Sequence, residues 1–113
     1  MILLDTHIWV WWVQADPRLS DRQRKLIQEN ESSGLGVNVI SVWEVAQLVQ
    51  LGRLILPKAI DDWVNDALNY PGMRLIELSR EIAIDTTRLP DPFHRDPADR
   101  IVVASARTSG FRC

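Results

Sequence analysis

The sequence predicts a small α/β domain in which helices cover both faces of a parallel sheet. Short apolar segments alternate with longer segments whose apolar residues recur at helical spacing. No turn signal typical of a β-hairpin joins two of the strand-like segments. The chain has 113 residues, of which 46% are hydrophobic and 25% charged, enough for one core but not for two. We therefore expect a single domain over residues 1–113, built as a three-layer α/β/α sandwich.

The N-terminal residues contain the first predicted strand. Residues 2–4 (Ile-Leu-Leu) are apolar and short, and residues 6–13 carry apolar side chains at the spacing of a helix. After a turn at residues 16–17, a charged helix begins with Ser20 as its cap and ends near residues 33–34. The predicted order at this end is therefore strand, helix, helix.

The middle of the chain repeats this order. Residues 37–40 predict a second strand, because three of the four are apolar and β-branched. Residues 41–51 then predict a helix that Gly52 closes, and a further helix runs from Pro57 to about Asn69. Each predicted strand is thus followed by helical segments long enough to cross over the sheet, as parallel pairing requires.

The last part of the chain carries a third predicted strand over residues 73–78 and a helix capped by Ser79. A proline-rich loop over residues 89–95 leads to a final helix, which opens at Asp96-Pro97 and runs to Gly110. In parallel sheets of this kind, ligands bind beyond the carboxyl ends of the strands, because helix N-termini converge there. That edge is where we expect the functional site.

Three carboxylates, Asp5, Glu44 and Asp99, stand where a strand or a loop gives way to a helix. Gathered at one sheet edge, they would repel one another and raise each other's pKa unless a positive group lies among them. A Mg²⁺ or Mn²⁺ ion suits this position, because hard cations bind carboxylate oxygens and keep several water ligands. The chemistry expected of such a site is hydrolysis of a phosphodiester.

Each of these carboxylates also has a purely structural explanation. Asp5 suits the N-cap of the first helix, where a carboxylate accepts from free backbone N–H groups. Glu44 follows Ser41 by three residues, which matches a capping box. Asp96 precedes Pro97 and suits the cap of the last helix, with support of a bound metal as its alternative role. The site hypothesis therefore depends on the three carboxylates acting together.

Other kinds of site have little support in the sequence. No glycine-rich phosphate-binding fingerprint occurs. The single cysteine, Cys113, excludes an internal disulfide framework and a thiolate zinc site. His7 and His94 do not form a zinc-binding H-E-x-x-H pair, and we expect neither to be a ligand. The N-terminal segment lacks a basic leader and Asp5 interrupts its apolar run, so no membrane association and a cytoplasmic location are expected.

Several short motifs follow one another in order along the chain. They are Met1-Ile2-Leu3-Leu4-Asp5-Thr6-His7, Ser41-Val42-Trp43-Glu44, Gly52-Arg53-Leu54, Leu89-Pro90, His94-Arg95-Asp96-Pro97-Ala98-Asp99-Arg100 and Val102-Val103-Ala104-Ser105-Ala106. This ordered set resembles that of the PIN-domain family, in particular toxins of the VapC type. The resemblance implies a Mg²⁺- or Mn²⁺-dependent endoribonuclease that hydrolyses RNA phosphodiesters. It also implies a homodimer that is the toxin of a toxin–antitoxin pair and is silenced by a cognate antitoxin.

By the same resemblance, Asp5, Glu44 and Asp99 take the metal-binding and catalytic positions. Thr6 and Ser41 are then neighbouring hydroxyls that hold a water of the metal. Family members continue beyond the equivalent of Gly110 into another parallel strand that carries a fourth acidic residue, so we expect a C-terminally shortened PIN-like fold. This departure leaves an alternative open: a catalytically impaired PIN-like module that binds antitoxin or dimerises without cleaving RNA.

Charge and aromatic content leave two surface roles open. The formal net charge of −2 argues against binding nucleic acid by bulk electrostatics, although a local basic face is compatible with it. From Arg74 onward, seven arginines accompany six carboxylates, which suits either a solvated surface or a face that contacts phosphates. Among the five tryptophans, Trp11 or Trp12 could anchor a subunit or antitoxin interface.

Overall fold

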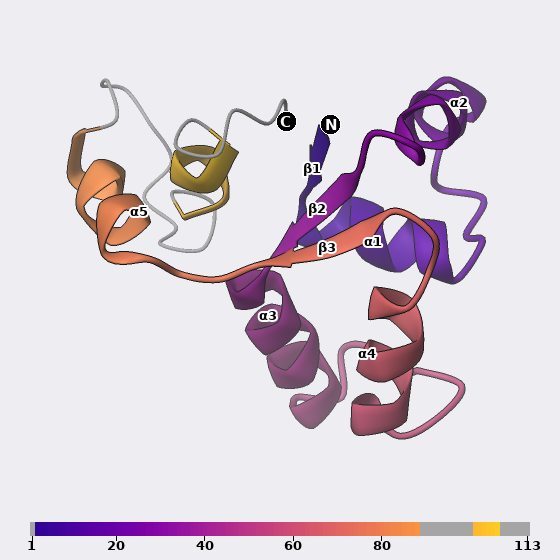
Figure 1. Cartoon of the computed structure of the whole chain (residues 1–113). Helices are drawn as coiled ribbons and strands as arrows, with labels where there is room; N and C mark the ends of the chain where they lie inside the picture. The colour runs from indigo at the N-terminus through magenta and orange to yellow at the C-terminus, as the bar shows by residue number, and fades with distance from the viewer. Residues whose placement is uncertain (1, 89–100, 107–113) are drawn as a thin grey trace.

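Three parallel strands form the centre of the fold in the computed structural model, which describes residues 2–88 and 101–106 (Figure 1). The strands are β1 (Ile2–Leu4), β2 (Leu35–Asn38) and β3 (Met73–Ile76), hydrogen-bonded in the order β1-β2-β3. Both pairs are parallel, with Leu3 opposite Gly36 in the first. The parallel sheet predicted from the sequence is therefore confirmed.

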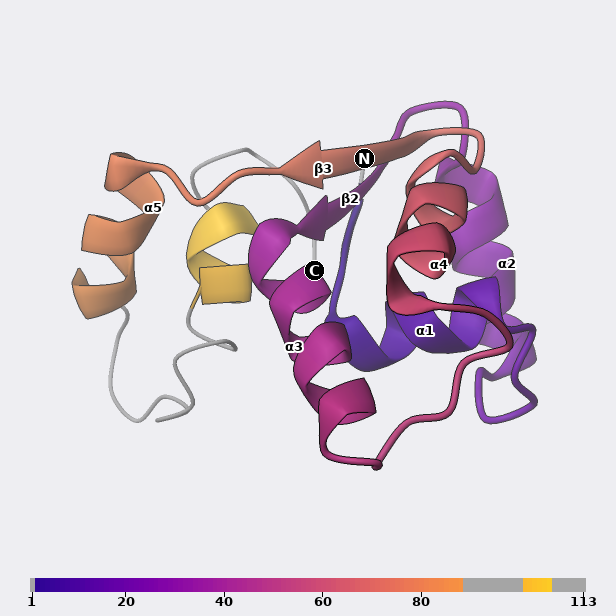
Figure 2. The same ribbon diagram turned by 90° about the horizontal axis from the view of Figure 1, so that it is seen from below.

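Helices connect the strands and lie on both sides of them (Figure 2). In both views α5 lies at one end of the molecule, beyond the end of β3, and α2 lies at the opposite end. Within the described part of the chain, no helix has the length and apolar character needed to cross a membrane. The helices are α1 (Thr6–Val13), α2 (Asp21–Asn30), α3 (Val39–Gln50), α4 (Ile60–Leu68), α5 (Arg80–Asp85) and the 3-10 turn η1 (Thr86–Arg88), and residues 101–106 are also helical.

Side chains of β1 divide between two hydrophobic clusters, because successive residues of a strand point to opposite faces of the sheet. Ile2 and Leu4 join the larger cluster, to which α1, α2, α3 and α4 contribute buried residues. Leu3 joins the smaller one, with Val102 and Ala106 of the last helical segment. β1 is thus covered on both faces and β2 is buried as well, which is typical of strands in α/β folds, whereas β3 is partly exposed.

Two tryptophans fill the centre of the larger cluster. The rings of Trp9 and Trp63 meet edge to face, with centroids 5.1 Å apart, and both side chains are buried. The indole N–H of Trp63 donates to Gln14 Oε1 at 3.1 Å. By contrast, Trp43 on α3 is 54% exposed. The most accessible indole therefore belongs to neither Trp11 nor Trp12, the two tryptophans that the sequence suggests for an interface.

The boundary between β2 and α3 differs from the predicted one by two residues. The sequence predicts a strand over residues 37–40, whereas the strand ends at Asn38 and Val39 begins the helix. The cause is Asn38 itself, whose side-chain oxygen accepts from the backbone N–H of Ile40 at 2.8 Å and so caps α3. The capping box predicted for Ser41 and Glu44 is therefore wrong.

Candidate functional site

Asp5 stands at the junction between β1 and α1. Its backbone is extended, and its Oδ1 accepts from the N–H of Ile8 at 2.9 Å, so it caps the helix as the sequence predicts. The side chain is exposed, and within the described residues its second oxygen, Oδ2, takes part in no hydrogen bond. Within the described part of the chain, the cap therefore uses one oxygen of an exposed carboxylate.

Thr6, the next residue, joins α1 to α3 through its hydroxyl. Thr6 Oγ1 lies 2.9 Å from Ser41 Oγ and 2.5 Å from Glu44 Oε1. A carboxylate only accepts, so the single hydroxyl proton of Thr6 goes to Glu44. Ser41 is then the donor in the bond between the two hydroxyls. Thr6 and Ser41 are buried and Glu44 is half-buried, so this network fixes the Glu44 carboxylate beside the residue that follows Asp5.

A second buried contact joins the start of α3 to the last helical segment. The side-chain amide of Asn38 donates to Ser105 Oγ at 2.5 Å, and Ser105 Oγ donates to the carbonyl of Ile101 at 2.7 Å. Asn38 and Ser105 are both fully buried. Since Asn38 also caps α3, one side chain ties together β2, the helix that carries Glu44 and residues 101–106.

A hollow of about 440 Å³ runs along β1, and Asp5 forms part of its wall. The remainder of the lining is mainly apolar and comes from β1, α1, α2 and residues 102–103. Because Asp5 is also exposed, an ion or a substrate arriving from solvent can reach its free oxygen. The same edge of the sheet holds the N-termini of α1 and α3, whose partial positive charge favours anions.

The sequence singles out six residues for the site, and the structure links four of them. Thr6 follows Asp5 in the chain, and its hydroxyl joins Ser41 and Glu44. Asp96 and Asp99 lie outside the described residues, and so does His94. Within residues 2–88 and 101–106, no three His, Cys, Asp or Glu side chains form a group that could hold a metal. Glu44 is thus linked to Thr6, the residue next to Asp5, and the metal-binding roles of Asp5, Glu44 and Asp99 all stay predictions.

The donor set at this edge fits a hard divalent cation. Asp5 has one carboxylate oxygen outside its helix cap, and the carboxylate of Glu44 is oriented by a single hydroxyl bond to one of its oxygens. Oxygen ligands of this kind, with waters completing the shell, are what Mg²⁺ and Mn²⁺ accept. Asp5 and Glu44 are thus the described residues that could hold such an ion.

Sequence reasoning missed two features of this region. Asn38 lies in the second strand, as the sequence predicts, but its second role as the cap of α3 is not predicted, although an asparagine directly before a helical pattern is a cap signal. The group formed by Trp11, His7 and Arg18 was also missed, because its contacts depend on how the turn after α1 folds back over the helix. Helical spacing does place His7 and Trp11 on one face, and this was the available signal.

Comparison with known proteins agrees with this architecture. The family model described as "PIN domain" matches residues 2–113. Ribonuclease VapC22 of Mycobacterium tuberculosis (strain ATCC 25618 / H37Rv) is 31% identical over 111 residues, which cover 98% of this chain and 82% of that protein. A match of this extent, on a parallel sheet with Asp5 and Glu44 following adjacent strands, identifies the chain as a member of the PIN-domain family, of the VapC type.

Proposed function

We propose that the chain is a metal-dependent endoribonuclease that hydrolyses RNA phosphodiesters and acts as the toxin of a toxin–antitoxin pair. The observation that carries this proposal is the network in which Thr6, the residue directly after Asp5, holds the Glu44 carboxylate at the start of α1. The similarity to a protein named as a ribonuclease of the VapC type supports the choice of RNA as substrate. Residues 1–113 act as one domain in this proposal.

Asp5, Glu44 and Asp99 are the proposed catalytic residues, and they hold a Mg²⁺ or Mn²⁺ ion. When bound, such an ion makes water a better nucleophile and stabilises negative charge on the phosphate. Thr6 and Ser41 orient the Glu44 carboxylate through their hydroxyls, which fixes one ligand position before the ion arrives. Asp5 is exposed, so substrate can approach its carboxylate from solvent. Asp96 caps the last helix or supports the metal.

Asp5→Asn is the test of this activity, because asparagine keeps the helix cap but loses the negative charge. With a 5′-labelled single-stranded RNA and Mn²⁺, we expect the native chain to cleave, EDTA to stop cleavage and Asp5→Asn to lower the rate at least a hundred-fold, roughly. Asp61→Asn, in the first turn of α4, is the matched control and should cleave like the native chain.

Cleavage that persists in Asp5→Asn would refute the proposed role of this carboxylate. Absence of cleavage in the native chain, together with intact antitoxin binding, would instead favour the alternative module that binds without cutting.

The toxin role has its own experiment. We expect induced expression of the native chain to arrest bacterial growth, and expression of Asp5→Asn at the same level to be harmless. Co-expression of a cognate antitoxin should restore growth, because the proposed antitoxin silences the toxin. Growth arrest by Asp5→Asn would separate toxicity from cleavage and contradict the proposal.

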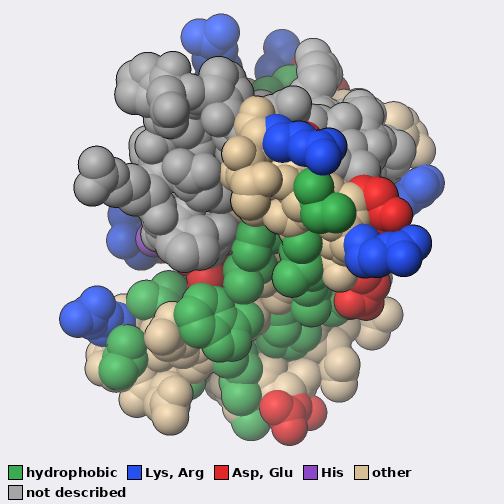
Figure 3. Space-filling view, turned by 90° about the vertical axis from the view of Figure 1, so that its left-hand side faces the viewer, with side chains coloured by type: hydrophobic (Ala, Val, Ile, Leu, Met, Phe, Trp, Pro, Cys, Tyr) green, Lys and Arg blue, Asp and Glu red, His purple; other side chains and the backbone are tan. Residues whose placement is uncertain are grey.

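A homodimer completes the proposal. Hydrophobic side chains gather on one stretch of surface on the side where α3 and α5 lie (Figure 3). Trp43 and Leu51, from α3 and its C-terminal cap, are 54% and 57% exposed and offer apolar surface for such a contact. Sedimentation equilibrium should give twice the mass of the chain, and Trp43→Lys should give the monomer mass.

A further inference from the structure

Trp11 is the centre of a group of aromatic and basic side chains on the outer surface of α1. The His7 ring lies against it at a centroid distance of 6.2 Å, tilted by 58°. The guanidinium carbon of Arg18 lies 5.3 Å from the centroid of the indole ring, in a cation–π arrangement. His7 is exposed, the Arg18 side chain is 68% exposed and Trp11 is half-buried, so the group is open to solvent while its indole is anchored in the fold.

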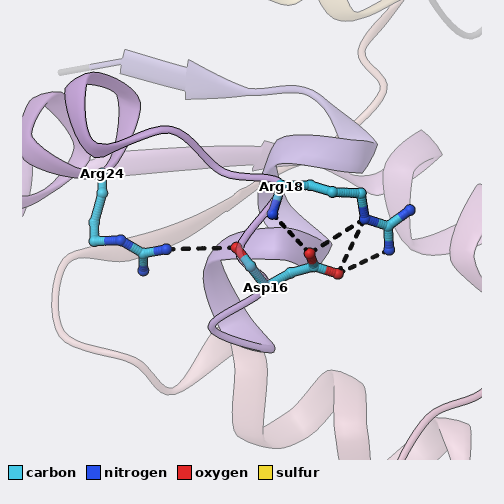
Figure 4. Close-up of polar contacts among 3 residues, drawn as sticks. All are labelled: Asp16, Arg18 and Arg24. Atoms are coloured by element: carbon cyan, nitrogen blue, oxygen red, sulfur yellow. Dashed lines mark hydrogen bonds and ion pairs between the residues drawn. The ribbon is translucent and has the colours of Figure 1, made fainter.

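Arg18 is held in this position before any ligand arrives. Asp16 accepts from Arg18 Nη2 at 2.8 Å and from Nε at 3.2 Å, and also from the backbone N–H of Arg18 at 2.9 Å (Figure 4). On the other side of the turn, Arg24 donates to the backbone carbonyl of Asp16 at 3.4 Å. In the described part of the chain Arg18 Nη1 has no hydrogen-bond partner, so its N–H groups and the outer face of the guanidinium are available.

The surrounding segment is basic although the chain as a whole is acidic. Residues 16–25 contain four cationic side chains and two carboxylates, whereas the full chain has a net charge of −2. Asp16 and Asp21 offset part of the charge of Arg18, Arg22, Arg24 and Lys25, so the four cations and two carboxylates leave an excess of positive charge in this segment. The positive potential is therefore concentrated at the turn between α1 and α2, which is the arrangement expected of a local phosphate-binding surface.

His7 and Trp11 lie on α1, the helix that is capped by the proposed catalytic residue Asp5. His7 is in the first turn of α1, directly after Asp5 and Thr6. Trp11 follows four residues later on the same face, about 6 Å further along the axis at a rise of 1.5 Å per residue. A nucleic acid strand whose phosphate reaches Asp5 can therefore extend along α1 over His7 and Trp11 to Arg18.

We propose that His7, Trp11 and Arg18 bind single-stranded RNA next to the cleavage site. Planar rings and a guanidinium held flat offer stacking surfaces to unpaired bases, and the free Arg18 N–H groups suit a phosphate. Single-stranded RNA fits better than a duplex, because only unpaired bases can turn out to stack on protein side chains. This inference rests on the proposed function, because RNA is the substrate proposed there.

The test measures RNA binding separately from cleavage. In the Asp5→Asn chain, which should not cut, binding of a short fluorescein-labelled single-stranded RNA is followed by anisotropy. Adding Arg18→Ala or His7→Ala should weaken binding, by about five-fold or more for a lost stacking contact. Arg80→Ala is the matched control, since Arg80 is 90% exposed and lies on α5 at the other end of the molecule, and it should change affinity less than about two-fold.

Salt dependence gives a second, independent measurement. Loss of one phosphate contact should reduce the slope of log K against log salt by roughly 0.7 for a single strand, in Arg18→Ala but not in Arg80→Ala. In the native background, Arg18→Ala should raise KM for RNA and leave kcat nearly unchanged. Thermal unfolding of each variant checks that the fold is retained.

The two proposals fail in different ways. If the native chain cleaves RNA but Arg18→Ala and His7→Ala bind it as tightly as Arg80→Ala does, the inference is overturned and the activity stands. If no cleavage occurs but both variants lose RNA binding, the surface stands and the activity falls. If Arg18→Ala keeps RNA binding and loses binding of a polyglutamate peptide, the group recognises an acidic protein segment and the inference is overturned.

Discussion

The Thr6 hydroxyl has one proton and two hydrogen-bond partners, so it donates to one of them and accepts from the other. Its proton goes to the Glu44 carboxylate, and it accepts from Ser41, so the three side chains form a directed chain from α3 to α1 and back to α3. Thr6 and Ser41 are buried, so water does not replace the bond between them, whereas Glu44 is half-buried and stays within reach of water. Loss of the Thr6 hydroxyl would therefore leave the Ser41 hydroxyl without its partner in a region of low dielectric.

We therefore predict that Thr6→Val, which keeps the shape of the side chain, lowers the free energy of unfolding by about 1 to 3 kcal/mol. Urea unfolding followed by circular dichroism measures the change. Thr87→Val is the control, because the Thr87 hydroxyl also makes a hydrogen bond, to the carbonyl of Ile84, but is exposed, and its loss should cost about 0.5 kcal/mol or less. Equal costs for the two variants would show that the buried network adds no stability.

Asp16 and Arg18 provide a prediction about pH. Hydrogen bonds from the Arg18 side chain and backbone lower the pKa of Asp16 below its ordinary value of 3.8. The folded state therefore keeps this carboxylate ionised at a pH where the unfolded chain begins to bind a proton. The stabilising effect is fully present above pH 3.8 and disappears as the pH falls through the lowered pKa.

Asp16→Asn should accordingly lower the Tm by a constant amount at neutral and mildly acidic pH, and by a shrinking amount below about pH 3.8. Thermal unfolding of both chains across this range measures the difference. In an Arg18→Ala background the same substitution should have an effect that varies much less with pH, because the main cause of the lowered pKa is gone. A difference that grows toward low pH would contradict the assignment.

The sequence could identify Asp5 and Glu44 because each follows a short apolar strand, and it could point to Thr6 and Ser41 as neighbouring hydroxyls. It could not show that Thr6 donates to Glu44, since that bond joins residues 38 positions apart and depends on how α1 packs against α3. Asp99 remains a prediction, since it lies outside the described residues.

At the scale of elements, the alternation of strands and helices was predictable because each strand is short, apolar and followed by a helical pattern. Boundaries were less predictable. Asn38 is a polar residue in a β-branched context, and only its hydrogen bonds to Ile40 and Ser105 show that it ends the strand. In the same way α4 begins at Ile60 rather than Pro57, with no side-chain cap at Ala59 to mark its start.

The connection from α4 to β3 gives a prediction at this scale. Gly72 has a φ of 81°, and a Cβ added there would lie 2.2 Å from the backbone carbonyl oxygen of Glu31. Its own carbonyl accepts from the N–H of Leu35 at 2.8 Å, so any shift of Gly72 disturbs the start of β2. Gly52 has a similar φ of 70°, but a Cβ there would meet no atom within 4 Å.

Gly52→Ala should therefore cost only the conformational penalty of a positive φ, about 1 kcal/mol. Gly72→Ala should cost about 1 to 3 kcal/mol more, because the backbone of Glu31 must move as well. Urea unfolding of both variants isolates the clash, since the backbone penalty is common to them. If the two variants are equally stable, the connection has room that the structure does not show.

At the scale of the whole molecule, the parallel sheet makes a site from residues that are far apart in the sequence. β1 and β2 are adjacent and point the same way, so the helices that follow them begin side by side, one carrying Asp5 at its cap and the other carrying Glu44. The N-terminus of α1 favours the negative charge of Asp5, whereas Glu44 lies in the second turn of α3, beyond the reach of the helix dipole. A cation bound by both carboxylates would offset their negative charge, and metal binding would then raise the free energy of unfolding.

We predict that Mn²⁺ stabilises the native chain, because an ion that binds only the folded state shifts unfolding by mass action. At a free Mn²⁺ concentration of about ten times the dissociation constant, the free energy of unfolding rises by about 1.4 kcal/mol. For a domain near this size, each kcal/mol raises the Tm by roughly 4 to 8 °C. Asp5→Asn and Glu44→Gln should each reduce the shift, whereas Asp61→Asn should not. Because the measurement needs no RNA, it separates two explanations of an inactive chain. If Mn²⁺ raises the Tm but no RNA is cleaved, the ion binds and the chemistry is incomplete. If Mn²⁺ shifts the Tm of no variant, the two carboxylates do not hold a metal.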